Sequence, residues 1–286
     1  MPASANLAGG GGLPHFPGMT NLTHLARRGV LAITGADRVA FLNGLVSNDV
    51  AKAAPGTAVW AALLTPQGRY LTDFFIFAAG DALLLDVAVE DIPRLEQKLR
   101  RMRLRAAVEL ADVSARYAVY AGWGGVPAEA GISAPDPRLP EAGWRILSET
   151  PLAATARAED YAAHRISLGL PDGVPDLEPD KTLLLEAGFD ELGGIAWDKG
   201  CYMGQELTAR TKYRGLVKRR LVPVALSRAA EPGMPVLAEG VDVGSLRSVA
   251  GGLGLAMLRL DALGRTLHAG TAVLTPRPPA WLRLPG

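Results

Sequence analysis

Hydrophobic residues in the first 120 positions follow two different spacings. Short apolar runs bounded by glycine, proline or aspartate predict strands at residues 28–34, 59–64, 70–78, 82–89 and 113–120. Apolar residues three and four apart predict two helices, one opened by Asp37 and the other by Asp91. Because the strands follow one another through short turns, they favour an antiparallel sheet with helices packed against it.

The pattern changes twice in the remaining part of the chain, residues 121–286. A strand at residues 144–147 and a helix at residues 158–168 precede an extended, proline-rich loop at residues 171–180. From Leu221 onward, glycine and proline interrupt short apolar runs, which is typical of a small sandwich or barrel. The pattern predicts an α+β protein, and 286 residues exceed what one core usually holds, so we expect two or three domains.

Charge and cysteine content narrow the function classes. The net charge of +1 gives no overall attraction to nucleic acid, so direct nucleic-acid binding is not expected. One cysteine cannot form an intramolecular disulfide or a thiolate metal site by itself, and no metal ligands are predicted. The first 20 residues show neither signal-peptide nor presequence character, and no apolar run approaches the ~20 residues that cross a bilayer. We therefore expect a cytoplasmic protein without a membrane partner.

The single cysteine lies in the segment that carries the most chemistry. Cys201 follows Lys199 and Gly200, and it precedes an amide and a carboxylate at residues 205 and 206. The thiolate is the reactive form of cysteine, and nearby cations such as Lys199 and Arg210 lower the pKa of a thiol. A lone cysteine is, however, more often a small buried hydrophobe. The residues alone leave both interpretations open.

Three neighbouring residues also admit two interpretations each. Gln205 and Glu206 have the groups to hydrogen-bond a planar heterocycle, and they equally suit a surface pair or the first turn of a helix. Tyr213 stands in a basic stretch that suits a phosphate, a polyglutamate tail or RNA, or else a solvated hairpin. With a net charge so close to zero, the hairpin is the preferred interpretation.

A carboxylate within an apolar strand forms a second candidate site. Strict alternation along residues 70–75 places Asp73 on one face with Leu71 and Phe75, and places Tyr70 on the other face. Burying a carboxylate is costly unless it is paired. Asp73 is therefore either a pocket carboxylate or a residue at the edge of the sheet.

The cysteine segment resembles the signature K-G-C-Y-x-G-Q-E of the YgfZ family, folate-binding proteins related to the glycine-cleavage T-protein, an aminomethyltransferase. Here the signature occupies residues 199–206, followed by Ala209-Arg210 and Arg214-Gly215. Four earlier segments agree in order, at residues 41–44, 47–50, 64–69 and 98–104. The resemblance covers roughly residues 25–275.

The resemblance implies a three-lobed α+β architecture around a central cavity that holds tetrahydrofolate. Two lobes combine an antiparallel sheet with helices, and a C-terminal β-barrel forms the third. On this chain we expect a tail at residues 1–19, lobes at residues 20–120 and 121–220, and the barrel at residues 221–286. The second lobe carries the cysteine segment.

The function implied is that of a tetrahydrofolate-binding accessory factor for the assembly or maintenance of iron–sulfur proteins, with an indirect effect on tRNA modification. The expected partners are folate and the iron–sulfur assembly machinery or its client enzymes. Cys201 is the expected functional thiol, with Asp73 as a second catalytic candidate. The residues expected to bind the folate are Asp73, Lys199, Tyr202, Gln205, Glu206, Arg210 and Arg214.

One departure separates the chain from transferases of the T-protein type. Those enzymes carry two adjacent acids where this chain has Thr72 and Asp73. The single acid lowers the expectation of glycine-cleavage chemistry. A tetrahydrofolate-dependent aminomethyltransferase nevertheless remains the alternative function, and whether the protein has classical enzymatic turnover is left open.

Overall fold

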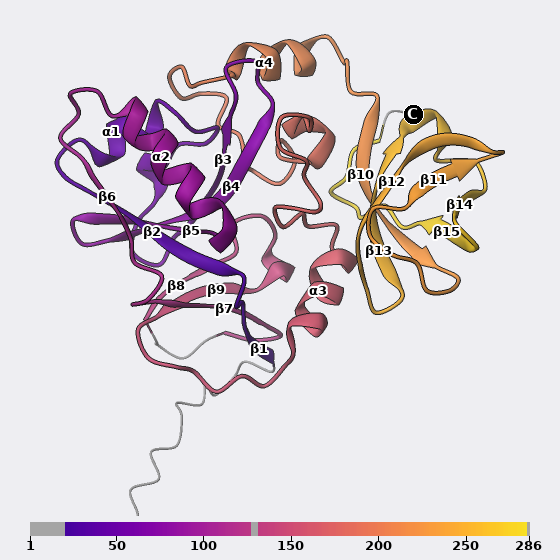
Figure 1. Cartoon of the computed structure of the whole chain (residues 1–286), viewed down its shortest axis with the longest axis horizontal. Coiled ribbons are helices and arrows are strands. Elements are labelled where there is room, and N and C mark those ends of the chain that lie inside the picture. The colour runs from indigo at the N-terminus through magenta and orange to yellow at the C-terminus, as the bar shows by residue number, and fades with distance from the viewer. Residues whose placement is uncertain (1–20, 127–130, 285–286) are drawn as a thin grey trace, which may run out of the picture.

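The computed structural model describes residues 21–126 and 131–284, which form three sheets and four α-helices (Figure 1). Residues 21–120, drawn in indigo and purple, build most of one side of the molecule, and the barrel lies at the opposite side. The tail predicted at residues 1–19 lies outside the described residues. In the described part of the chain, no helix is long and apolar enough to cross a membrane.

The first sheet has five antiparallel strands in the order β3-β4-β5-β2-β6. Its strands are β2 (Arg28–Thr34), β3 (Val59–Leu64), β4 (Tyr70–Ala79), β5 (Ala82–Ala88) and β6 (Glu109–Asp112). Helix α1 (Arg38–Asn43) follows β2, and helix α2 (Ile92–Met102) packs its apolar residues against the sheet. The strands predicted up to residue 89 are confirmed.

The second sheet has four strands in the order β1-β7-β9-β8. They are β1 (Asn21–His24), β7 (Ala118–Trp123), β8 (Ile132–Pro135) and β9 (Trp144–Ser148), and helix α3 (Ala158–Ser167) contacts the barrel strand β12. The strand predicted at residues 113–120 is wrong in its first half. Residues 113–116 form a turn closed by the bond from the Arg116 amide to the Val113 carbonyl, and β7 begins only at Ala118.

The C-terminal strands close into a six-stranded barrel in the order β10-β13-β12-β11-β14-β15, which confirms the barrel prediction. They are β10 (Arg219–Leu226), β11 (Pro235–Ala238), β12 (Val241–Ala250), β13 (Leu253–Arg259), β14 (Leu267–Ala269) and β15 (Ala272–Pro276). Closure pairs every strand on both edges. The structure therefore shows the predicted α+β architecture with a C-terminal barrel.

Short helices occupy the connections. The fourth α-helix, α4 (Gln205–Tyr213), lies at the upper edge of Figure 1 between the first sheet and the barrel. Single 3₁₀ turns form at Val50–Lys52, Val89–Asp91, Pro140–Ala142, Leu184–Ala187 and Leu260–Ala262. The proline-rich segment at residues 171–180 is a loop without helix or strand, as predicted.

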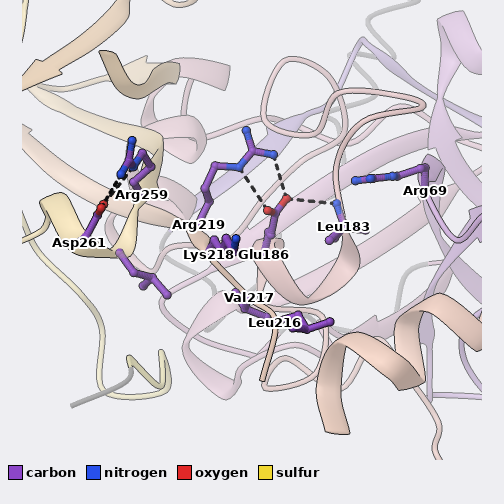
Figure 2. Close-up of a pocket in the computed structure, with 10 residues that line it drawn as sticks. Arg69, Leu183, Glu186, Leu216, Val217, Lys218, Arg219, Arg259 and Asp261 are labelled. Atoms are coloured by element: carbon purple, nitrogen blue, oxygen red, sulfur yellow. Dashed lines mark hydrogen bonds and ion pairs between the residues drawn. The ribbon is translucent and has the colours of Figure 1, made fainter. Parts of the chain in front are cut away.

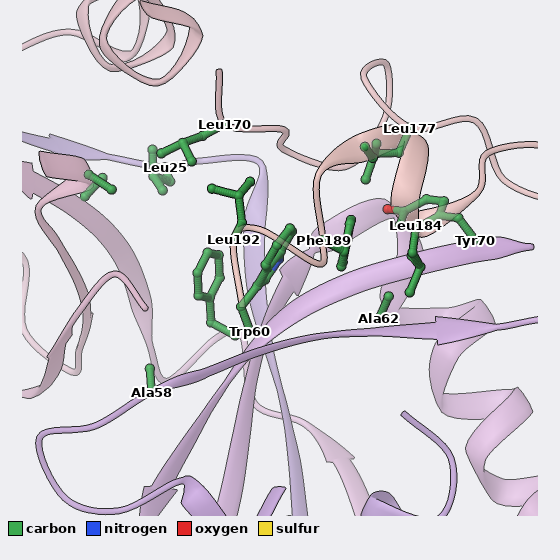
Figure 3. Close-up of a cluster of buried hydrophobic side chains, with 14 of the residues drawn as sticks. Leu25, Ala58, Trp60, Ala62, Tyr70, Leu170, Leu177, Leu184, Phe189 and Leu192 are labelled. Carbon is green, nitrogen blue, oxygen red and sulfur yellow. The ribbon is translucent and has the colours of Figure 1, made fainter. Parts of the chain in front are cut away.

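Aromatic side chains pack where the first sheet meets the loops of the second lobe (Figure 3). The Trp60 ring stacks on Phe189 with 3.9 Å between ring centroids. A buried arginine continues the contact, because Arg28 of β2 pairs with Asp86 of the same sheet and with Asp172 of the second lobe. Within the second lobe, Arg165 pairs with Asp176. Because Arg165 also bonds Ser248 of the barrel, the network fixes the barrel against α3.

Candidate functional site

The cysteine loop, residues 198–204, leads directly into helix α4. Cys201 is exposed and its thiol is free. The interpretation of Cys201 as a small buried hydrophobe is therefore wrong, because its side chain contributes to the surface and not to a core. An exposed thiol is available to a metal cluster, an electrophile or a partner protein.

Lys199 holds the cysteine loop on the first lobe. Its Nζ donates three hydrogen bonds to main-chain carbonyls, to Asn43 at 2.6 Å, Val46 at 2.9 Å and Asn48 at 2.8 Å. Burial lowers the pKa of Lys199 to about 8, a shift that Asp49 opposes, so the ammonium is still mostly protonated at pH 7. All three N–H groups are in use, so Lys199 acts as an attachment and has no free donor for the thiolate.

Two glycines bring the cysteine loop against the turn that joins β3 to β4. A Cβ placed on Gly204 would lie 2.6 Å from the Thr65 carbonyl oxygen and 2.9 Å from the Cα of Gly68. Gly204 also has a φ of +81°, in the left-handed region that favours glycine. The segments at residues 64–69 and 199–206, which are 130 residues apart in the sequence, are therefore in direct backbone contact.

Tyr202 and Gln205 complete the loop. Tyr202 is buried, and the burial raises its pKa to about 12, so the phenol stays protonated. The Gln205 side-chain oxygen accepts a bond from the Tyr202 amide at 3.3 Å, which ties the loop to the first turn of α4. Gln205 and Glu206 thus form the start of a helix, one of the two interpretations that the sequence left open.

The remaining predicted residues on α4 face outward. Glu206 and Arg210 form an exposed ion pair one helical turn apart, at 2.6 Å. For the Arg214 side chain the described residues supply no hydrogen bond or ion pair. Tyr213 ends the helix, so the predicted hairpin around it is wrong.

Asp73 lies in the core of the first sheet and has its own partners. Its two oxygens accept bonds from the Trp60 indole at 2.8 Å and from the Tyr70 hydroxyl at 2.7 Å. Burial raises its pKa, while Arg28 and these two bonds lower it, and the raised value prevails. Within the described chain, no hydrogen bond or ion pair joins Asp73 to the cysteine loop.

The face assigned to Tyr70 and Leu71 by strict alternation is wrong. The register between β3 and β4 shifts between Leu63 and Leu64, because a bulge interrupts the ladder. Tyr70 therefore shares a core with Phe75, whereas Leu71 packs into the opposite core. The bulge is what allows the Tyr70 hydroxyl to reach Asp73.

A cavity of about 780 Å³ opens between the lobes and the barrel (Figure 2). The first lobe contributes Arg69, the second lobe contributes Glu186 and the linker residues after α4, and the barrel contributes Arg259 and Asp261. Glu186 is buried and is paired with Arg219 at 3.2 Å. The Lys218 side chain has no ion-pair partner among the described residues, so it is available to an anionic ligand.

Sequence reasoning missed Glu186 and Gly68 as site residues. Glu186 is a single carboxylate within an apolar run of the sequence, and this position was the signal that could have marked it as a site residue. Gly68 belongs to the segment at residues 64–69 that carries part of the resemblance, and its contact with Gly204 depends on a long-range packing arrangement that no local pattern encodes.

The fold and site define a class: proteins with the architecture of the glycine-cleavage T-protein. The solved structure of the glycine cleavage system aminomethyltransferase T from Bartonella henselae superposes with a TM-score of 0.70, covering 92% of this chain and 86% of that one. At 13% identity the likeness shows the fold alone. Residues 218–284 match the family model described as CAF17, C-terminal beta-barrel domain.

Full-length relatives identify the family more closely. The chain is 32% identical over 277 residues to the mitochondrial iron-sulfur cluster assembly factor IBA57 of Homo sapiens, covering 84% of this chain and 78% of the relative. It is 36% identical over 236 residues to an IBA57 homolog of Mycosarcoma maydis, where the match spans 58% of that protein. The chain belongs to the IBA57 family of iron–sulfur cluster assembly factors.

The comparisons change two expectations. They support the wider family group, whereas the narrower resemblance to YgfZ stays a prediction. The cytoplasmic location is wrong by the same comparisons, because the relatives from Homo sapiens, Mus musculus and Mycosarcoma maydis are all named as mitochondrial. Their names point to mitochondria.

Proposed function

We propose that this protein assists iron–sulfur cluster assembly by offering the Cys201 thiolate as one ligand to a cluster in transit. The observation that carries the proposal is the exposed, free thiol on a loop held at both ends. Family membership supports the cargo, because the relatives are named as iron–sulfur cluster assembly factors.

The ligand count determines what a partner contributes. Iron–sulfur clusters are commonly held by four cysteine thiolates. This chain contains one cysteine, so the other ligands come from a carrier or client protein. A single exposed ligand suits transfer, since a cluster held by one thiolate from this side is released more easily than one held by four.

Complementation tests the role of the thiol. A strain that lacks its own relative of this protein receives the wild type, Cys201→Ser or Gly200→Ala, and the activity of cluster-dependent enzymes is measured per amount of enzyme. Gly200→Ala is the matched control, because a Cβ there meets nothing within 4 Å. We expect rescue by Gly200→Ala and failure of Cys201→Ser. Full rescue by Cys201→Ser at equal protein level would remove the thiol from the mechanism.

The effect on tRNA modification is proposed as indirect. Enzymes that modify tRNA with the help of iron–sulfur clusters would lose activity together with other cluster enzymes. The Cys201→Ser strain should therefore lose cluster-dependent tRNA modifications and keep cluster-independent ones. Loss of both kinds would contradict an effect that passes through cluster supply.

We further propose tetrahydrofolate as the ligand of the cavity between the lobes and the barrel. The volume of about 780 Å³ lies within the range of pockets that hold molecules of this size. The buried Glu186 carboxylate can accept bonds from the amino-pyrimidine edge of a pterin, and Lys218 can pair with the glutamate tail. Bound tetrahydrofolate carries one-carbon units on its ring nitrogens.

Asp73 does not fit the same ligand as well as Glu186 does. The oxygens of both carboxylates already accept bonds, so the difference lies in the space beside them. The stacked Trp60 and Phe189 rings fill the space next to Asp73, whereas Glu186 lines the open cavity. A pterin at Asp73 would have to displace Trp60 or Tyr70. The folate is therefore proposed at Glu186, and Asp73 is proposed as part of the core.

Titration with 5-formyltetrahydrofolate, followed by the fluorescence of the protein, tests the cavity. Glu186→Gln and Lys218→Ala should each weaken saturable binding, the first by removing a charged acceptor. Arg228→Ala, at an exposed barrel position that does not line the cavity, is the matched control. Binding that is absent, or that neither cavity variant changes, would contradict this ligand site.

A further inference from the structure

Helix α4 presents an ordered surface that the proposed cluster transfer does not use. We name as the α4 surface the exposed side chains of Arg210, Tyr213, Arg214 and Leu216. Glu206, Arg210 and Tyr213 are spaced four and three residues apart, so they share one stripe of the helix. The nine residues of α4 extend about 13 Å from the end of the cysteine loop.

The centre of this surface is apolar. Among the described residues eight large hydrophobic side chains are exposed, and Tyr213 and Leu216 are the two closest along the chain, with 77% and 47% exposure. Among these eight exposed residues of the described chain, Tyr213 is the one with an aromatic side chain. Exposed aromatic residues beside arginine are typical of the central contacts of protein interfaces.

Backbone geometry holds both apolar side chains in place. The Leu216 amide bonds the Thr211 carbonyl and the Gly215 amide bonds the Lys212 carbonyl, which are the two bonds of a Schellman cap. Gly215 has a φ of +60°, as this cap requires. The cap turns Leu216 back toward the helix end and leaves its side chain exposed. Ordering Leu216 when a partner binds would therefore cost little conformational entropy.

An aromatic support fixes Tyr213. The Tyr213 ring meets Trp197 edge to face, with centroids 6.3 Å apart. Trp197 is held in turn by its bond to Asp190 and by the Lys212 ammonium, which lies 3.9 Å from its ring centroid. The Tyr213 ring is therefore supported from within the protein before a partner binds.

Charge around the apolar centre selects the kind of partner. Between residues 205 and 220 the chain has six lysines or arginines and one glutamate, although the whole protein has a net charge of only +1. Several of these cations are neutralised by inward ion pairs, such as Lys212 with Asp190. In the described structure Arg214 and Lys218 have no such partner, which leaves a positive rim around Tyr213 and Leu216.

We infer that the α4 surface docks an acidic protein, one that places aspartate or glutamate around an apolar contact. An RNA ligand fits less well, because two unpaired cations neutralise few phosphates and Leu216 has no role against a phosphate backbone. The inference rests on the proposed function for the identity of the partner as the protein that supplies the other cluster ligands. Docking here would bring that protein next to Cys201.

Photocrosslinking of the full chain in cells tests the inference. p-Benzoyl-phenylalanine replaces Tyr213, and in a matched control it replaces Val241, a 56% exposed residue of the barrel. We expect a protein crosslink from position 213 whose contact peptide has an excess of aspartate and glutamate. Arg214→Glu should reduce that crosslink about tenfold or more, and Arg228→Glu, a charge reversal on the exposed barrel surface, should leave it unchanged.

Four outcomes would overturn the docking surface. They are a crosslink to RNA, a crosslink to a second copy of the chain, a crosslink that Arg214→Glu leaves intact, and a yield no higher than from position 241. The test separates docking from chemistry, because Cys201→Ser decides the role of the thiol and leaves the α4 surface unaltered. A strong crosslink in a Cys201→Ser background that still fails complementation supports both proposals.

Discussion

Replacement of Gly204 by alanine tests the backbone contact that positions the cysteine loop. Gly204→Ala adds a Cβ that lies 2.6 Å from the Thr65 carbonyl oxygen, and its other nearest neighbours are the Gly68 Cα and the Cβ of the strand residue Leu64. The left-handed φ of +81° adds a cost of about 1–2 kcal/mol for any residue with a Cβ. Overpacking adds about 1–3 kcal/mol. The free energy of unfolding should therefore fall by about 2–5 kcal/mol.

Urea unfolding measures this loss. With a denaturant dependence of about 3 kcal/mol per molar, a loss of 3 kcal/mol lowers the midpoint by about 1 M. Gly200→Ala, four residues earlier in the same loop, is the matched control, because it has neither a positive φ nor an atom within 4 Å of its Cβ. Its free energy of unfolding should stay within about 0.5 kcal/mol of the wild-type value.

A second glycine variant separates local strain from the proposed contact. A Cβ on Gly68 would lie 2.8 Å from the Gly204 carbonyl oxygen, so Gly68→Ala should also destabilise. If the two glycines meet as described, the first variant already opens the contact, and the double variant should cost less than the sum of the two. Equal midpoints for Gly204→Ala and Gly200→Ala would refute the reasoning, and full additivity would place the strain outside the shared contact.

Three further outcomes follow from the buried polar groups. Lys199→Met removes three charged hydrogen bonds and should lower the free energy of unfolding by about 1–3 kcal/mol, measured in urea; an unchanged midpoint would mean that the bonds do not hold the loop. Asp73→Asn turns one acceptor into a donor that faces Trp60 or Tyr70, so thermal unfolding should show a loss of about 1–3 kcal/mol, and no loss would contradict a core role. Although burial raises the pKa of Asp172, Arg28 and Arg165 lower it to about 2, below its unfolded value near 4. The ionised Asp172 carboxylate should therefore contribute about 2 kcal/mol to the free energy of unfolding above pH 4, and this contribution is lost as the pH falls through 2. In an acid titration, the stability of Asp172→Asn should fall less steeply over this pH range than that of the wild type. Identical curves for the two proteins would be the contrary result.

The strand pattern of the first lobe was predictable because burial on one or both faces leaves a local record in the sequence. The runs at residues 59–64 and 70–78 became β3 (Val59–Leu64) and β4 (Tyr70–Ala79), nearly as predicted. The side on which Tyr70 points was not predictable. It depends on a bulge between paired strands, and a bulge is a property of the pair and not of either strand alone.

The candidate site shows the same division. The cysteine segment was identified from its residue types. Its exposure could not be predicted from them, because a lone cysteine between glycines suits a core as well as a surface. Lys199 was expected beside the thiolate on the basis of adjacency. In the structure its ammonium turns to three carbonyls of the first lobe, which come within reach only when residues 43–48 fold beside it.

The sequence by itself determined the α+β class, the short strands of the C-terminal part and the candidate segment around Cys201, because these depend on local periodicity and residue type. Only the tertiary structure decided that Tyr213 ends a helix, that Glu186 lines a cavity shared by three lobes, and that Gly204 meets Gly68. These features arise between segments far apart in the chain. Their energies come from close packing and paired charges, which no spacing within one segment records.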